Sequence, residues 1–254
     1  MKRTALALIA ILAQIWRIIP YGLRRRLIFA LAVLETRIGT PADSLRRLYP
    51  IADDIEKAIN ERAMAYGGGE HPKHELTHYH DFFIDRIEDG SRVLDIGCGY
   101  GAVARSIARD VGNSRVTGVD IDPAAIAQAN AADNPDNLNF VAGDALQDLP
   151  AGDWNVVILS NVLEHIDARV EFLKNLRERL SPEKLLIRVP LFERSWHIPM
   201  RRALGIGYFS DITHFIEHTR DAFDAEIAEA GFEIIERQTL WGEIWASCRP
   251  RVDA

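Results

Sequence analysis

The sequence predicts a doubly wound α/β fold with a mostly parallel seven-stranded sheet, an antiparallel last strand and an N-terminal helical extension. Beyond residue 90, short apolar runs alternate with helical segments at the pitch of βαβ units. The early runs are apolar almost throughout, which is typical of strands covered on both faces. Only Trp241 and Gly242 separate the last two strand candidates. This connection is too short for a parallel crossover, so the final strand is predicted to run antiparallel.

The individual elements follow in chain order. Strands are predicted at residues 92–97, 115–122, 137–144, 154–161, 184–191, 232–240 and 243–248. Helices are predicted at residues 51–67, 81–90, 102–112, 123–133, 170–180 and 219–232. Three helix starts carry Pro50, Pro123 and Thr219, because proline suits the first helical position and threonine the N-cap. Glycines such as Gly231 are typical of helix ends.

These elements divide the chain into three parts. Residues 1–47 form a basic, amphipathic helical head, and residues 48–90 form a helical cap and entrance segment beside the ligand site. Residues 91–254 form the α/β domain. Within that domain, residues 192–218 are an insertion whose length and aromatic side chains suit a substrate lid.

Composition and charge favour a folded protein without a nucleic-acid partner. The 254 residues are 48% hydrophobic and 26% charged, which argues against disorder. Nine Lys/Arg against two acidic residues give residues 1–47 a charge of +7, and the remainder carries −14. An acidic body does not suit a nucleic-acid backbone. Cys98 and Cys248 form no disulfide framework, so a reducing, cytoplasmic compartment is expected.

The head carries apolar residues at helical spacing, namely Leu8, Ile11, Leu12, Ile15, Trp16 and Ile19. Residues 4–16 are too short to cross a bilayer, which takes about 20 apolar residues. A signal peptide and a stripe packed on the chain's own domain are two alternatives. The preferred hypothesis is a helix lying on the inner face of an anionic membrane, with Arg24, Arg25 and Arg26 meeting lipid phosphates.

The segment LDIGCGYGA (94–102) breaks a buried strand into glycines that precede a helix. Glycines permit the tight turn and let backbone N–H groups approach a ligand. These glycines and Ala102 also satisfy the dinucleotide fingerprint of an NAD enzyme. Asp95 argues against that alternative, because its carboxylate would repel a pyrophosphate and could hold a cationic amino group. Asp120 ends the next strand, where it is placed to accept from both hydroxyls of a ribose.

Four ordered motifs resemble those of the class I S-adenosylmethionine-dependent methyltransferases, especially the small-molecule branch with a VLEH element. They are LDIGCGYG, GVDID, GDALQDLP (143–150) and ILSNVLEHI (158–166). The resemblance covers about residues 75–248, including the reversed last strand. It implies a Rossmann-like methyltransferase fold and S-adenosyl-L-methionine as the cofactor. The segment SPEKLLI (181–187) departs from the family, in which a Gly-Gly pair commonly precedes the fifth strand.

The resemblance also implies which residues bind the cofactor. These are Asp95, Gly97, Gly99, Gly101, Asp120, Ile121, Asp144 and Ala145. The three glycines would line the methionine and ribose portions. In chain order, the three aspartates would hold the amino group, the ribose hydroxyls and the adenine amino group. The isoleucine and the alanine would lie beside the adenine.

Methyl transfer from a sulfonium is an in-line displacement, so the protein must align the acceptor, the methyl carbon and the sulfur. The resemblance places Asn161 and Leu163 under the cofactor near the transferred methyl. A general base helps an alcohol acceptor. His165, in the VLEH element, and His214, in the predicted lid, are the two candidates. Loop ordering and lid packing are their non-catalytic alternatives.

Half of the eight histidines fall within HPKHELTHYH (71–80), directly after three glycines. On a helix, His74 and His78 would share a face and could hold zinc. No cysteine or close aspartate clearly completes that ligand set, so the sequence assigns no metal site. The preferred interpretation is a flexible entrance behind a Gly67–Gly69 hinge. Residues there that could touch cofactor or acceptor are Thr77, Tyr79 and His80.

The sequence therefore predicts an S-adenosylmethionine-dependent methyltransferase. The basic head and the lid favour an acceptor hydroxyl or amine on a small molecule, a sugar or a lipid-linked intermediate at the membrane face. An NAD(P)-dependent oxidoreductase is the rival enzyme class. A non-catalytic module that binds the cofactor is a third hypothesis that the motifs alone leave open.

Overall fold

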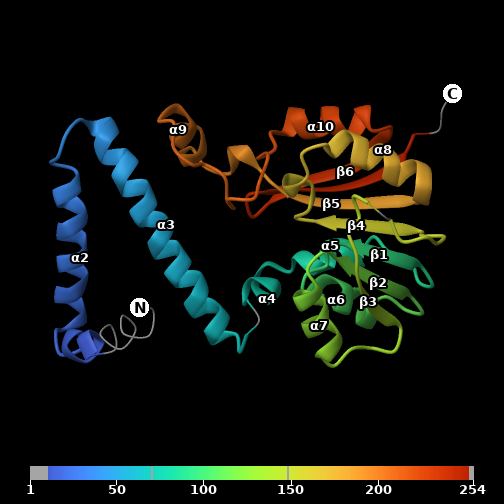
Figure 1. The fold of residues 1–254 in the computed structure, drawn as a ribbon, viewed down its shortest axis with the longest axis horizontal. Helices are drawn as coiled ribbons and strands as arrows, with labels where there is room; N and C mark the ends of the chain where they lie inside the picture. Colours follow the sequence, from blue (N-terminus) through green and yellow to red (C-terminus); the bar gives the residue numbers. More distant parts are fainter. Residues whose placement is uncertain (1–10, 70, 148, 252–254) are drawn as a thin grey trace.

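The computed structural model describes residues 11–69, 71–147 and 149–251. The strands in these ranges are β1 (Arg92–Ile96), β2 (Arg115–Asp120), β3 (Leu138–Ala142), β4 (Val156–Ser160), β5 (Lys184–Pro190), β6 (Phe232–Leu240) and β7 (Glu243–Pro250). They form one sheet in the order β3-β2-β1-β4-β5-β7-β6. Strands β1 to β5 pair in parallel, and β7 is antiparallel to both β5 and β6 (Figure 1). The predicted sheet with one reversed strand is therefore confirmed.

Helices connect the strands and extend the chain at its N-terminal side. The α-helices are α2 (Tyr21–Glu35), α3 (Pro41–Tyr66), α4 (Lys73–Thr77), α5 (Tyr79–Ile84), α6 (Ala102–Asp110), α7 (Pro123–Ala131), α8 (Arg169–Leu180), α9 (His197–Ala203) and α10 (Arg220–Glu229). Two short 3-10 turns are η1 (Leu163–His165) and η2 (Phe192–Arg194). Residues 11–16 are helical as well.

Two hydrophobic clusters fill the two faces of the sheet. Helices α8 and α10 cover one face, where Phe223 packs with Leu185 and Ile187 of β5. Helices α5, α6 and α7 cover the other face, where Phe83 packs with Leu186. Successive residues of β5 therefore point to opposite faces, as the period of a strand requires. Because both faces are covered, the strand is apolar at consecutive positions rather than at alternate ones.

Helix α3 begins earlier than we predicted. The Thr40 hydroxyl accepts from the Asp43 N–H, the Asp43 carboxylate accepts from the Thr40 N–H, and Pro41 takes the first helical position. This capping box starts the helix. Pro50, which we expected at the start, lies inside it. The boundary predicted between residues 47 and 48 therefore falls within one continuous helix.

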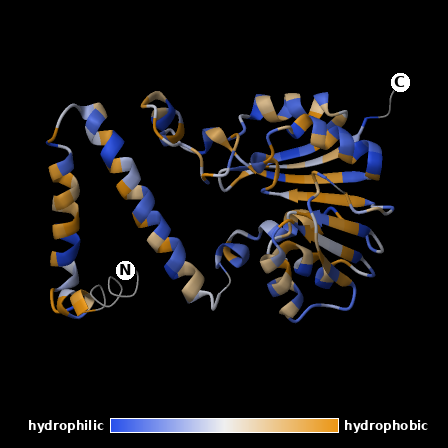
Figure 2. Cartoon of the chain, in the orientation of Figure 1, coloured by the Kyte–Doolittle hydropathy of each residue, from blue (hydrophilic) through white to orange (hydrophobic). Residues whose placement is uncertain are grey.

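Helices α2 and α3 form a hairpin whose two arms diverge from the turn that joins them (Figure 2), and several apolar residues of α2 are exposed. In the described part of the hairpin, α2 buries no residue, and Phe29 and Leu31 are 69% and 66% exposed. Ile11 and Ile15 of the predicted apolar stripe are exposed as well, while Leu8 lies outside the described residues. No helix among the described residues is long and apolar enough to cross a membrane. Binding to a membrane surface stays a prediction.

The insertion at residues 192–218 contacts both the hairpin and the sheet edge. In α9, Arg201 pairs with the Asp53 carboxylate of α3 at 2.5 Å, and His197 Nδ1 lies 3.0 Å from the Tyr49 hydroxyl. Near its other end, the Phe215 N–H donates to a backbone carbonyl of η1 at 2.8 Å. The insertion therefore joins α3 to the end of β4, where the site lies.

Candidate active site

The glycine segment after β1 makes a turn that requires glycine. Gly97, Gly99 and Gly101 have φ angles of +70°, +53° and +79°. A Cβ on Gly97 would lie 2.5 Å from a methyl carbon of Val162, and one on Gly101 would overlap the Phe140 ring. Other residues rarely adopt these φ angles. The turn therefore lets the backbone before α6 approach a ligand closely.

Asp95 is a buried carboxylate with an unused oxygen. It is 1% exposed, and among the described residues its Oδ2 has no hydrogen-bond partner. Burial, followed by the charge of Asp120, raises the pKa of Asp95 to about 7. A buried carboxylate is unfavourable unless a cation or a hydrogen-bond donor meets it. A ligand ammonium group therefore suits this position.

Asp120 and Asp144 lie at the carboxyl ends of β2 and β3. Asp120 Oδ2 accepts from the Gly99 N–H at 2.7 Å, and its Oδ1 accepts from the Asp122 N–H at 2.8 Å. Asp144 Oδ1 accepts from the Leu146 N–H at 3.0 Å. These backbone bonds fix the orientation of both carboxylates. Each oxygen retains a further lone pair that can accept from a ligand.

A cavity of about 410 Å³ lies at these strand ends. Its lining includes six of the predicted cofactor residues, namely Gly97, Asp120, Ile121, Asp144, Ala145 and Asn161. The structure does not bring Leu163 into this group. Its side chain is 1% exposed and packs in the hydrophobic core, because η1 turns it inward. We refer to this space as the smaller cavity.

A larger cavity of about 690 Å³ adjoins the smaller one at Gly97. Asp95 lines it, together with several cationic or titratable side chains, namely His71, Lys73, His74, Arg105 and Arg188. Burial lowers the pKa of Lys73. The two cavities thus place Asp95 and Asp120 on either side of the glycine turn.

The histidine segment contributes one wall of the larger cavity. Helix α4 ends at Thr77, and the next residue, His78, has a left-handed φ of +50°. His74 and His78 therefore do not share a helix face as a zinc pair would. His74 Nδ1 instead lies 2.7 Å from the Tyr79 hydroxyl and 3.2 Å from His80 Nε2. His80 Nδ1 in turn contacts the Ser106 hydroxyl at 2.7 Å. Burial, followed by the charge of His74, lowers the pKa of His80 to about 4.

Arg188 organises the wall between the cavities, and we did not predict it. It is 5% exposed, donates to Asn161 Oδ1 and pairs with the Glu243 carboxylate at 3.0 Å. Its guanidinium carbon lies 3.8 Å from the centre of the Tyr79 ring. Asn161 also donates from Nδ2 to Glu164 Oε1 at 2.9 Å. The arginine inside the otherwise apolar run LLIRVPL (185–191) was the available signal, because buried arginines are rare without a partner.

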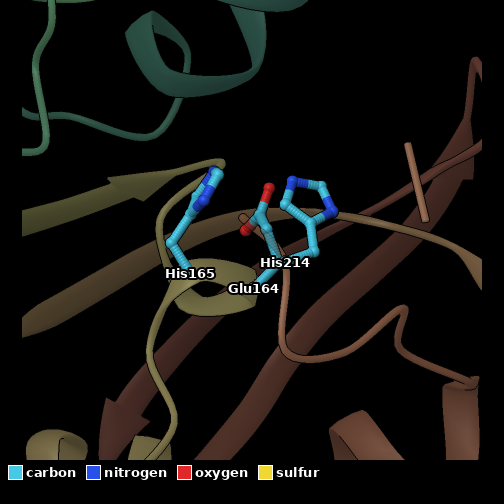
Figure 3. Close-up of side chains that lie close together, drawn as sticks. All are labelled: Glu164, His165 and His214. Carbon is cyan, nitrogen blue, oxygen red and sulfur yellow. The ribbon is translucent and has the colours of Figure 1, made fainter. Parts of the chain in front are cut away.

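The structure brings the two candidate catalytic histidines together (Figure 3). The rings of His165 and His214 meet edge to face with centroids 4.5 Å apart, and the Glu164 carboxylate lies beside both rings. His165 lines the smaller cavity. Burial, followed by the charge of His214, lowers the pKa of His165. Burial raises the pKa of Glu164 to about 7.

Comparison with known proteins identifies the family. Residues 69–237, more than half of the chain, match a family model described as a methyltransferase domain. The chain belongs to the class I S-adenosylmethionine-dependent methyltransferases. The enzyme class predicted from the motifs is therefore confirmed, and the methyltransferase domain displaces the NAD(P)-dependent oxidoreductase as an alternative.

Solved methyltransferase structures share the fold. A chain of the complex between the Haloferax volcanii Trm112 methyltransferase activator and a methyltransferase has a TM-score of 0.59 and 17% identity, covering 77% of this chain and 99% of that chain. Magnesium protoporphyrin IX methyltransferase from Synechocystis PCC 6803, with bound SAH, has a TM-score of 0.55 and 18% identity. That match covers 70% of this methyltransferase and 83% of the other chain.

A sequence relative corrects the predicted acceptor. The ribosomal protein L11 methyltransferase of Thermotoga maritima is 29% identical over 194 residues, which are 69% of this methyltransferase and 70% of the relative. Other relatives have the same name. A protein acceptor in that name contradicts the small-molecule, sugar or lipid-linked acceptor that we predicted. That prediction was wrong because a basic head and an aromatic-rich insertion do not distinguish one acceptor class from another.

Proposed function

We propose that this methyltransferase binds S-adenosyl-L-methionine along both cavities and transfers its methyl group to a hydroxyl or amine on a protein. The observation that carries the proposal is the unused, buried Oδ2 of Asp95. The ammonium group of the methionine portion would meet that oxygen in the larger cavity. Asp120 would accept from the ribose hydroxyls, and Asp144 would accept from the adenine, in the smaller cavity. Gly97 lies between the two cavities, where the absence of a Cβ leaves room for the ligand.

When bound, the cofactor supplies an electrophilic methyl carbon, whose bond to sulfur breaks as the acceptor oxygen or nitrogen attacks in line. The three aspartates would hold the two ends of the cofactor, so that the reacting carbon has a fixed position. Asn161, oriented by Arg188 and Glu164, lines the cavity wall beside it. His165, which lines the smaller cavity and whose pKa is lowered by burial, would take the proton that leaves the acceptor.

The name of the relatives supports a protein acceptor. A protein acceptor of that kind also supports the cytoplasmic location that the cysteine usage predicts. A cell extract incubated with methyl-labelled cofactor and the purified enzyme, then separated into protein, lipid and small-molecule fractions, tests the proposal. We expect the label in the protein fraction. Label confined to the lipid or small-molecule fraction would contradict the acceptor class.

Calorimetry with the demethylated cofactor, SAH, tests the cofactor half of the proposal separately. We expect one SAH to bind per chain. His78→Asn is a suitable control variant, because His78 is exposed, lines neither cavity and has a left-handed backbone that asparagine tolerates. A chain that takes up no SAH would remove the basis of the proposed function.

A further inference from the structure

Glu164, His165 and His214 form a cluster with the composition of a metal site. Among the described residues, one ligand atom from each of the three lies within 4.8 Å of the other two. The carboxylate and one histidine come from η1, and the other histidine comes from the insertion (Figure 3). Two imidazoles and one carboxylate are a known ligand set for divalent metals, and they leave coordination positions open.

The carboxylate of Glu164 has an oxygen that the described protein groups do not satisfy. The residue is fully buried, and Oε1 accepts from Asn161 Nδ2 at 2.9 Å. Oε2 has no hydrogen-bond partner among the described residues. An unpaired carboxylate oxygen beside two ring nitrogens is unfavourable unless a positive charge lies among them. A metal cation at this point would supply that charge.

The neighbours of both histidines leave their Nε2 atoms ready to coordinate. The Thr213 hydroxyl donates to Asp211 Oδ1 at 2.7 Å, so it must accept from His165 Nδ1 at 2.8 Å. The Glu217 carboxylate can only accept, so His214 Nδ1 donates to it at 3.2 Å. With the proton on Nδ1, each ring has a lone pair on Nε2. Carboxylate and hydroxyl partners on the far nitrogen are typical of histidines that bind metals.

From these observations we infer that Glu164, His165 and His214 bind a divalent first-row transition-metal ion at the edge of the smaller cavity. The site is closed on one side by the insertion, because the Phe215 N–H donates to the Glu164 carbonyl. His165 lines the smaller cavity, so the cluster lies at the edge of that cavity. The structure thus assigns a metal site that the sequence pattern alone did not reveal.

The use of this site in methyl transfer rests on the proposed function, whereas metal binding itself does not. A hydroxyl coordinated to the ion loses its proton more readily, because the ion stabilises the resulting oxyanion. With the ion bound, His165 would serve as a ligand in place of the proton acceptor proposed above for the metal-free site, and water would carry the proton away. The acceptor atom would be an oxygen, held beside the methyl carbon.

Cobalt titration of the full chain, stripped of metal by a chelator and dialysed, tests the inference. Co²⁺ is the probe because its visible absorption reports coordination by protein ligands. We expect one Co²⁺ per chain, and binding at least about tenfold weaker in Glu164→Gln and in His214→Gln. Thr213→Val keeps all three ligands but removes the hydroxyl partner of His165, so it should weaken binding about tenfold. His78→Asn should bind Co²⁺ like the unmodified chain.

Two results would overturn the inference. One is a full chain that binds no Co²⁺ up to millimolar concentration. The other is Co²⁺ binding in Glu164→Gln, His214→Gln and Thr213→Val that matches the His78→Asn control. Thermal unfolding of each variant separates lost ligands from lost folding, and Thr213→Val decides the matter if a ligand variant does not fold. SAH calorimetry on the same samples is independent, since failure to bind SAH contradicts the proposed function and leaves the metal assignment in place.

Discussion

The α/β domain and the α2–α3 hairpin are both rich in aliphatic and aromatic residues, but they bury them very differently. Leu185, Leu186 and Ile187 of β5 have no exposed surface, whereas Phe29 and Leu31 of α2 are about two-thirds exposed. The strands have a helical layer on each face, whereas α2 diverges from α3 and buries no residue. Hydrophobic composition therefore does not indicate a core unless a second layer is available to cover it.

A polar contact joins the two helices of the hairpin to each other. Arg47 Nε pairs with the Glu35 carboxylate at 2.7 Å and holds α2 against α3, and both side chains are about one-third exposed. Ion pairs at that level of exposure contribute about 0–1 kcal/mol each. Apolar burial in the domain contributes far more, since a fully buried large side chain is worth about 1.5–3 kcal/mol. The domain should therefore set the stability of the whole chain.

The largest difference between the two regions should appear on truncating one phenylalanine in each. Phe223→Ala, on the buried face of α10, should lower the free energy of unfolding by about 3–5 kcal/mol, because it leaves a cavity. Phe29→Ala, on exposed α2, should change it by no more than about 0.5 kcal/mol. Urea unfolding of the two variants measures both values. Equal losses would show that the hairpin belongs to the same cooperative core.

Within the domain, the next largest effect should come from Asp120→Asn. An amide has one acceptor oxygen, so it cannot serve the Gly99 N–H, the Asp122 N–H and the ribose hydroxyls together. Loss of hydrogen bonds to a charged acceptor costs about 1.5–3 kcal/mol, which weakens SAH binding roughly 10–150-fold. Calorimetry measures this change. Asp122→Asn is the matched control, because asparagine can also cap α7 and Asp122 lines neither cavity.

Features that depend on short stretches of sequence were predictable. The apolar run around Leu186 indicated a strand covered on both faces, and two residues between the last strands were enough to predict the reversal of β7. The glycines of the turn at 97–101 were also identified, because few residue types tolerate their φ angles. In each case the physical constraint acts within a few neighbouring residues.

Features that depend on distant contacts were not predictable in the same way. His165 and His214 were separate candidates for one role, and the folded chain brings them together through the Phe215–Glu164 backbone bond and the Thr213–His165 contact. Arg188 has its ion-pair partner 55 positions further along the chain, on β7. The start of α3 is an exception of another kind, since Thr40 and Asp43 were local signals that we gave less weight than Pro50.

The pH dependence of stability and of SAH affinity should distinguish the buried carboxyl of Asp95 from the exposed carboxylates. Burial and then Asp120 raise its pKa to about 7, so the native state holds the proton more tightly than the unfolded chain does. Its contribution to stability is therefore complete below a pH of about 4 and is lost as the pH rises through about 7. SAH affinity should follow the opposite course, rising about tenfold from pH 6 to pH 8, because the ammonium group favours the ionised carboxylate.

Asp95→Asn should remove that pH dependence of SAH affinity and should weaken binding above pH 7. The comparison must be made between the variant and the unmodified chain, because Glu164 also titrates at about pH 7 and affects stability in the same range. Calorimetry at several pH values provides the measurement. An unchanged pH profile in Asp95→Asn would mean that another group holds the ammonium end of the ligand.

The smallest effect on the domain should come from deleting residues 1–39, which removes α2 and keeps the Thr40 cap of α3. The loss of the Arg47–Glu35 pair should change the free energy of unfolding by less than about 1 kcal/mol, and SAH affinity should stay the same. A loss of several kcal/mol in urea unfolding would place α2 in the core.

The same pair of proteins tests the membrane prediction by flotation with anionic vesicles, since only the full chain has the exposed apolar residues of α2 together with the Arg24–Arg26 cluster. Equal recovery of both proteins with the vesicles would assign the exposed apolar surface some other role than lipid contact.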